Sequence, residues 1–343
     1  MTTINLSTSN NILCELSHLG LLEISGADAV TFLQGQLTND VKLLHGTNAH
    51  YSAYCNPKGR MLALFLAFAH HNNQLGNHYH LQLNRELLEP MMKRLKMYVM
   101  RSQVEINDVS DSIVKFGLYG PQAASMLAPM FNPSLSASFS ASLSASLSAS
   151  FSTSFSKVPT EEFELVSVEN GTLLKLPSAN NNARFEIFTN AANAPLIWNM
   201  LKNNCQIVDK NYWELLEIQA GIPDISLATQ EQFVPQMLNL DILNAINFKK
   251  GCYTGQEIIA RTHYLGSVKR RTYLAEISLQ PAPGDKVTDA TQSQIGQIVR
   301  SAPNLTGSFD VLAEMRIDVV TGGVLNCNDA PILLKTLPYS LDK

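Results

Sequence analysis

The chain is poor in charged residues and lacks the signals of a secreted or membrane-spanning protein. Charged residues make up only 16% of its 343 residues, hydrophobic residues make up 45%, and the net charge is −4. Residues 1–11 carry neither the basic nor the apolar stretch of a signal peptide. No apolar run reaches the roughly 20 residues that a membrane span needs. We therefore expect a cytoplasmic protein of two or three domains that does not bind membranes. The net charge also argues against a protein that binds nucleic acid with its whole surface.

The chain has no cysteine framework either. Its five cysteines are odd in number, widely scattered and never spaced as Cys-x-x-Cys. This pattern excludes a disulfide-stapled fold, and no single segment supplies a closed set of zinc or iron–sulfur ligands. A reducing compartment suits it best. The cysteines are Cys14, Cys55, Cys205, Cys252 and Cys327.

One octapeptide carries the most distinctive chemistry of the chain. Thr254 and Glu257 have the spacing of a capping box, which predicts that Thr254 caps a helix running through 258–260. Cys252 would then lie just outside a helix N-terminus, where unpaired N–H groups favour the thiolate over the thiol. The alternative is that Cys252 is a buried cysteine that packs like a small apolar side chain and has no chemical role. The motif consists of Lys250, Gly251, Cys252, Tyr253, Thr254, Gly255, Gln256 and Glu257.

The rest of the chain alternates strands and helices with hairpins, which predicts an α+β fold with mostly antiparallel pairing. A long apolar strand over 61–69 and its return over 78–83 form one hairpin, and a helix with an apolar stripe follows over 85–98. From Thr272 onward, short strands separated by Pro- and Gly-rich turns predict a small β-barrel or sandwich.

Residues 134–156 form a low-complexity segment with serine at every even position. Alternation usually predicts a strand, but this segment far exceeds the usual strand of about 5–6 residues. We interpret it as an insertion between domains and assign it no chemistry. The predicted domains are 1–133 (α+β), the insertion 134–156, a second α+β domain over 157–267 that carries the octapeptide, and a C-terminal β-barrel over 268–343.

Other polar and aromatic groups leave alternatives open. His70, His71, His78 and His80 cluster on one hairpin, where a metal site competes with the simpler reading of polar residues at a hairpin tip. Trp213 is either a core residue or a stacking platform for a flat heterocycle. Arg261, His263, Tyr264 and the basic run at 269–271 could receive ligand carboxylates or RNA phosphates. The alternative for the basic run is a strand edge.

With its surroundings, the octapeptide resembles the YgfZ family of folate-binding proteins linked to tRNA modification. The resemblance covers nearly the whole chain except the serine-rich segment. It rests on the segments Gln34-Gly35-Gln36-Leu37-Thr38-Asn39-Asp40, Cys55-Asn56-Pro57-Lys58-Gly59-Arg60, Ala220-Gly221-Ile222-Pro223 and Lys250-Gly251-Cys252-Tyr253-Thr254-Gly255-Gln256-Glu257.

The resemblance implies a three-domain architecture like that of the glycine-cleavage aminomethyltransferase, arranged around a central channel. It also implies binding of folate, as a tetrahydrofolate derivative, in the N-terminal region. The implied partners are iron–sulfur enzymes or their assembly machinery, with tRNA affected indirectly. Cys252 corresponds to the family's functional cysteine, and Trp213 to its folate-stacking tryptophan.

Two departures from related proteins matter. Aminomethyltransferases carry acidic residues shortly after the first hairpin turn, but here 60–64 contains no carboxylate, which argues against glycine-cleavage activity. The tryptophan expected before the first strand is Leu19, so folate stacking is expected from Trp213 on one side only. Our hypothesis is a folate-binding accessory protein that acts in iron–sulfur cluster assembly or repair, and thereby in tRNA modification, through Cys252. The alternative is a folate-dependent one-carbon or aminomethyl transferase that acts on tRNA or a small amine.

Overall fold

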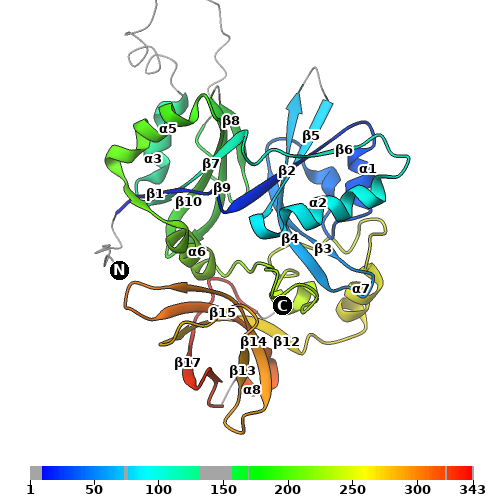
Figure 1. Cartoon of the computed structure of the whole chain (residues 1–343), viewed down its shortest axis with the longest axis vertical. Coiled ribbons are helices and arrows are strands. Elements are labelled where there is room, and N and C mark those ends of the chain that lie inside the picture. The colour runs from blue at the N-terminus through cyan, green and yellow to red at the C-terminus, as the bar shows by residue number, and fades with distance from the viewer. Residues whose placement is uncertain (1–9, 73–75, 132–156, 169, 321–322, 342–343) are drawn as a thin grey trace, which may run out of the picture. The chain divides into compact units, whose positions relative to one another are not determined.

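The computed structural model describes residues 10–72, 76–131, 157–168, 170–320 and 323–341. The predicted insertion at 134–156 lies outside these residues. Figure 1 shows the path of the chain, which divides into two compact units. The first unit takes residues 1–16 and 111–208, and the second takes 17–110 and 209–343. The three predicted domains stay a prediction.

The first unit is built on a sheet with strand order β11-β1-β7-β10-β9-β8. All its pairings are antiparallel except that of β1 with β11. The β9–β10 hairpin turns through Asn180 and Asn181, both with positive φ (47° and 62°), as a tight hairpin turn requires. The elements are β1 (Ile12–Glu15), β7 (Ile113–Gly120), α3 (Ala123–Leu127), η2 (Ala128–Phe131), β8 (Leu165–Val168), β9 (Gly171–Ala179), β10 (Asn182–Asn190), α5 (Ala194–Leu201), η3 (Lys202–Asn204) and β11 (Gln206–Val208).

Helices α3 and α5 close the core of this first unit. Leu127 of α3 and Ile197 of α5 join one apolar cluster with Leu118 and Phe185 of the sheet. Each of these side chains is at most 2% exposed. The helices therefore cover one face of the sheet, as an α+β layer structure requires.

The second unit contains a five-stranded antiparallel sheet of order β3-β4-β5-β2-β6. Strand β4, which lies between β3 and β5, is buried at every position from Met61 to Ala69. Because successive side chains point to opposite faces, both faces of this strand are covered in the folded chain. The elements are β2 (Leu19–Ser25), α1 (Ala29–Gln34), η1 (Val41–Leu43), β3 (Ala49–Cys55), β4 (Met61–Asn72), β5 (Gly76–Asn84), α2 (Arg85–Val99) and β6 (Glu105–Asp108).

Three helical elements follow in the second unit: α6 (Lys210–Gln219), η4 (Pro235–Leu238) and α7 (Gln256–Tyr264). Asp209 caps α6, because its carboxylate accepts the backbone N–H groups of Asn211 and Tyr212 at 3.0 and 3.3 Å. Arg300 of the following barrel donates two hydrogen bonds to Glu214 of α6, at 2.5 and 2.6 Å. This bidentate pair ties α6 to the barrel.

The chain ends in a closed barrel with strand order β12-β15-β14-β13-β16-β17, which confirms the predicted C-terminal barrel. Arg270 and Arg271 of the basic run at 269–271 open β12, and Lys269 lies just before the strand. Arg271 forms a buried bidentate ion pair with Asp241, at 2.6 and 3.0 Å, and Arg270 pairs with Glu314. Two of these three cations therefore serve the fold. The elements are β12 (Arg270–Ile277), β13 (Lys286–Thr288), β14 (Gln294–Pro303), β15 (Phe309–Arg316), α8 (Ile317–Val320), β16 (Asn326–Cys327) and β17 (Ala330–Lys335).

Candidate functional site

The octapeptide forms a loop that leads directly into α7, but Thr254 is not the helix cap. The N-cap is Gly255, and no side chain caps the first turn. The capping-box prediction was therefore wrong. Gly255 holds a left-handed φ of 84°, which a glycine adopts without the strain that a Cβ would bring. The predicted helix through 258–260 is confirmed.

Close approach of two backbones explains the glycine at 255. A Cβ there would lie 2.6 Å from the carbonyl oxygen of Asn56 and 2.9 Å from Cα of Gly59. A Cβ added to Gly59, which has a φ of 70°, would lie 3.1 Å from Cβ of Ile258 and 3.3 Å from the carbonyl oxygen of Gly255. The turn between β3 and β4 and the start of α7 thus pack backbone against backbone. Two motifs nearly 200 residues apart meet here in the second unit.

Lys250 anchors the octapeptide loop to the segment that contains Leu37 and Asn39. Its ammonium donates to the carbonyl oxygens of Leu37 and Asn39 at 2.6 and 2.8 Å, and it lies 5.1 Å from the ring centre of Tyr253. Burial lowers the pKa of Lys250 to about 8, although the carboxylate of Asp40 opposes this shift. The ammonium group of Lys250 is therefore held by two backbone carbonyl oxygens.

Cys252 is exposed, in contrast to the other cysteines. Cys14, Cys55 and Cys327 are buried and Cys205 is half-buried. Burial raises the pKa of Cys55 far above its ordinary value. The position before Cys252 is open too, since a Cβ on Gly251 would meet nothing within 4 Å. The loop therefore presents one thiol to solvent between the anchors at Lys250 and Gly255.

Trp213, the predicted stacking residue, lies on α6 and is 1% exposed. Glu217 follows it by one helical turn and is also buried, with an oxygen 4.0 Å from Arg300. Asp224 lies beyond the end of this helix, and burial raises its pKa to about 7 against the opposing charge of Arg300. Leu19, the other predicted contact, is the first residue of β2 and is half-buried.

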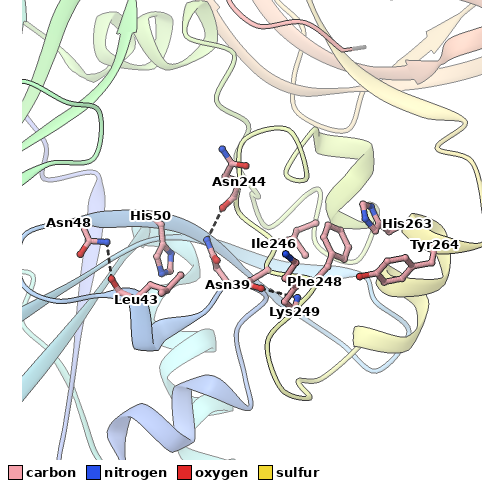
Figure 2. A pocket seen from close by; sticks show the side chains of 11 residues that line it. Asn39, Leu43, Asn48, His50, Asn244, Ile246, Phe248, Lys249, His263 and Tyr264 are labelled. Atoms are coloured by element: carbon pink, nitrogen blue, oxygen red, sulfur yellow. Dashed lines mark hydrogen bonds between the residues drawn. The ribbon is translucent and has the colours of Figure 1, made fainter. Parts of the chain in front are cut away.

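A pocket of about 640 Å³ lies beside the octapeptide in the second unit, with side chains from the η1–β3 region, the 244–249 segment and α7 (Figure 2). This volume is within the range typical of small-molecule sites, about 300–1,000 Å³. Lys249 is the one lysine or arginine among its lining residues, and none of them is Asp or Glu. The lining residues are Asn39, Leu43, Asn48, His50, Asn244, Ile246, Asn247, Phe248, Lys249, His263 and Tyr264.

An aromatic stack forms one wall of this pocket. The rings of Phe248 and His263 lie nearly parallel at 12°, with centroids 3.7 Å apart. Tyr264 stands edge-on to both of them. The sequence pointed to His263 and Tyr264 as ligand-facing residues, but the stack with Phe248 required the loop and the helix to fold together.

Satisfied amides form the floor of the pocket. Asn39 donates to the carbonyl oxygens of Tyr51 and Asn244 at 3.0 and 2.8 Å. Asn48 donates to the carbonyl oxygen of Leu43 at 3.0 Å. Burial lowers the pKa of His50 to about 4, so its imidazole is neutral near pH 7. Sequence reasoning missed the floor, because only the Thr38–Asn39 segment carried a family signal.

The hairpin histidines lie on β4 and β5. His78 and His80 both face Glu23 of β2, at 3.2 and 3.5 Å, and the side chain of His71 lies outside the described residues. Within the described ranges, no group of three or more His, Cys, Asp or Glu side chains is arranged to hold a metal ion. No helix in those ranges is long and apolar enough to span a membrane.

Comparisons with known proteins agree with the motif. A family model described as the GCVT N-terminal domain matches residues 6–146. The tRNA-modifying protein YgfZ of Yersinia pestis (strain Pestoides F) is 31% identical over 343 residues, which cover 96% of this chain and 92% of that protein. The chain belongs to the YgfZ family. The YgfZ protein of Sodalis glossinidius (strain morsitans) is 29% identical over 340 residues, with 96% of this chain and 93% of the relative covered.

The solved structures show which fold this YgfZ chain has. The glycine cleavage system aminomethyltransferase T from Bartonella henselae matches with a TM-score of 0.72 at 15% identity, over 97% of this chain and 87% of that one. At this identity the match shows the fold alone. The expected aminomethyltransferase-like α+β fold is therefore confirmed.

Proposed function

We propose that this chain is a cytoplasmic, folate-binding accessory protein in tRNA modification and that Cys252 is its reactive thiol. The observation that carries the proposal is the exposure of this one cysteine among five, on a loop anchored at both ends. A nucleophilic thiol must reach its electrophile, whereas a buried thiol is inert. The names of the relatives, tRNA-modifying proteins, support the cellular process.

The proposed link to tRNA runs through iron–sulfur clusters, as the family resemblance implies. Cys252 would act on sulfur or on a cluster that belongs to a client enzyme during assembly or repair. A thiol that handles a client's cluster must be accessible to a second macromolecule, and Cys252 meets this requirement. Lys250 and Gly255 would hold the thiol in a fixed position without blocking it.

The residue types around Trp213 suit a pterin, and because Trp213 is 1% exposed, the side chains that cover its indole would have to move when a pterin binds. An indole offers a flat face for stacking, and a carboxylate accepts the amino and ring N–H groups at a pterin edge. Trp213 and Glu217 share one face of α6 because they are four residues apart. We assign these two residues to the pterin and Leu19 to an apolar contact beside it. Bound folate would supply one-carbon chemistry.

The sequence 60–64 supports an accessory role rather than aminomethyl transfer. Met61 to Leu64 lie on β4, each at most 6% exposed, and Arg60 donates to the carbonyl oxygen of Gln232 at 2.6 Å. A general base for an amine would need a carboxylate or imidazole in such a place.

The test uses a bacterial strain that lacks its own YgfZ gene. Thiolated tRNA nucleosides would be quantified by mass spectrometry, with and without this chain, and purified protein would be titrated with tetrahydrofolate. We expect the chain to restore the nucleosides and to bind folate, with weaker binding by Trp213→Ala. Unrestored nucleosides despite soluble expression would contradict the proposal. Turnover of a purified amine or tRNA substrate with tetrahydrofolate would support a transferase instead.

A further inference from the structure

We infer that the pocket beside the octapeptide, lined by Asn244, Asn247, Phe248, Lys249, His263 and Tyr264 among others, binds one unpaired nucleotide of an RNA strand. The inference extends the proposed role in tRNA modification and rests on it. It names a contact that the role itself does not require. Four kinds of observation carry it: the aromatic wall, the rim of polar side chains, the charge of the pocket and its place in the chain.

The aromatic wall suits a nucleobase. Phe248 and His263 already stack in parallel at 3.7 Å, so a flat heterocycle can continue the stack on an outer ring face. Tyr264 is 63% exposed and stands edge-on beside them, where its ring can confine the base laterally. Stacking on aromatic side chains is the common way in which proteins hold unpaired bases.

The polar rim suits the edge of a base. Asn39 and Asn48 donate their side-chain N–H groups to backbone carbonyl oxygens, which holds the pocket floor in place. By contrast, the structure gives no hydrogen-bond partner among the described residues to the side-chain amide of Asn244 or to Nδ2 of Asn247. A carboxamide can donate and accept at once, which matches the paired donors and acceptors on base edges. Figure 2 labels Asn39, Asn48 and Asn244 among the side chains that line the pocket.

The charge of the pocket suits a phosphate. Lys249 is exposed and, among the described residues, has no carboxylate within salt-bridge distance. The carboxylate closest in sequence to the pocket floor belongs to Asp40, which does not line the pocket. It accepts hydrogen bonds from Nε2 of Gln34 and from the backbone N–H of Lys42. A phosphate at Lys249 therefore meets one cation and no lining anion, as phosphate contacts need.

The place of the pocket in the chain ties it to the thiol. Phe248 and Lys249 precede Cys252 by four and three residues, and His263 and Tyr264 end the helix that follows the loop. A single folded segment, 244–264, therefore carries both the pocket wall and the exposed cysteine. An RNA held in the pocket would be bound by the same segment that presents the thiol.

The test measures RNA binding by the full chain with matched variants. Fluorescence anisotropy would follow deacylated bulk tRNA and a short unstructured oligoribonucleotide at several salt concentrations. We expect His263→Ala to weaken both affinities about tenfold through lost stacking. Lys249→Gln should weaken both affinities. It should also reduce the slope of log affinity against log salt concentration by about one, because one phosphate contact is lost. Lys286→Gln, an exposed lysine on β13 of the barrel, and Tyr98→Ala, an exposed tyrosine on α2, should bind as the wild type does.

Crosslinking with an oligoribonucleotide that contains 4-thiouridine gives the position of the base, and we expect adducts on Phe248, His263 or Tyr264. Adducts confined to other segments, or equal RNA affinity in His263→Ala, Lys249→Gln and wild type, would overturn the inference. So would binding of free AMP without binding of either RNA, because the pocket would then serve a small nucleotide. In each case, restoration of thiolated tRNA in the deletion strain would still stand as evidence for the proposed function.

Discussion

The loop that carries Cys252 and the turn that follows Cys55 pack against each other through Gly255 and Gly59, yet their thiols are in opposite environments. Cys55 ends β3 and is 1% exposed, and its burial raises its pKa. Cys252 lies in an open loop. Both cysteines belong to motifs that resemble the family. A motif cysteine therefore becomes available for chemistry through its packing and not through its presence in the motif.

The two cysteines should differ most in how fast their thiols react. In the native protein, iodoacetamide should alkylate Cys252 at least about a thousandfold faster than Cys55, because Cys55 reacts only after an opening that costs several kcal/mol. Peptide mass spectrometry over a time course would measure both rates, and urea-unfolded protein is the control in which they should converge. Similar alkylation rates of Cys252 and Cys55 in the native protein would contradict the difference in their packing.

The backbone contact behind this contrast can be broken at Gly255. Gly255→Ala should lower the free energy of unfolding by about 3 kcal/mol, because a left-handed residue gains a Cβ that collides with the carbonyl oxygen of Asn56. Gly251→Ala is the matched control, since its Cβ meets nothing, and it should change stability by less than about 0.5 kcal/mol. Urea denaturation compares the two. Equal stability of both variants would show that the close approach is unimportant.

The anchor of the loop can be removed at Lys250. Lys250→Met should cost about 2 kcal/mol, because it leaves the carbonyl oxygens of Leu37 and Asn39 without their donor. Lys249→Met, at an exposed position, should cost little. In thermal or urea unfolding, an equal effect of the two substitutions would mean that the buried contacts do not hold the loop.

The pH dependence sharpens this result. The folded pKa of Lys250, about 8, lies below its ordinary value of 10.5, so between these pH values the unfolded chain binds more protons than the folded chain. The free energy of unfolding therefore rises from pH 8 to 10.5. This contribution is lost again as the pH falls to 8. Lys250→Met lacks this contribution, so the stability gap to wild type should widen as the pH rises. A gap that stays constant would contradict the lowered pKa.

The smallest effect concerns the pocket floor. The ring protons of His50 should titrate by NMR with a midpoint near pH 4, below the ordinary 6.5, because burial disfavours the charged ring. Stability should fall as the pH drops from 6.5 toward 4, since the unfolded chain takes up a proton that the folded His50 does not bind. His50→Gln should show a shallower decline. A midpoint near 6.5 would mean that the floor is open to water.

The sequence was sufficient for features that repeat locally or match a family. A long apolar run predicted strand β4, the capping-box spacing predicted a helix through 258–260, and turn-rich short strands predicted the C-terminal barrel. It failed at Thr254, where the capping box had the right spacing. There the contact of Gly255 with the Asn56–Gly59 turn, distant in sequence, decides where the helix begins.

Long-range pairing also explains what the sequence could not reveal. Glu23 meets His78 and His80 only because β2 pairs with β5, and Arg271 pairs with Asp241 only once β12 packs beside η4. The pocket floor at Asn39 and its wall at Phe248 come from segments about 200 residues apart. Residue spacing along the chain carries no information on such meetings.

The role of the exposed thiol is tested by comparing Cys252→Ala with Cys55→Ala in the strain that lacks its own YgfZ gene. Both variants would be checked for soluble expression, and thiolated tRNA nucleosides would be measured by mass spectrometry. We predict that Cys252→Ala fails to restore the nucleosides and that Cys55→Ala restores them. Full restoration by Cys252→Ala would contradict the assignment of the exposed thiol as the functional group.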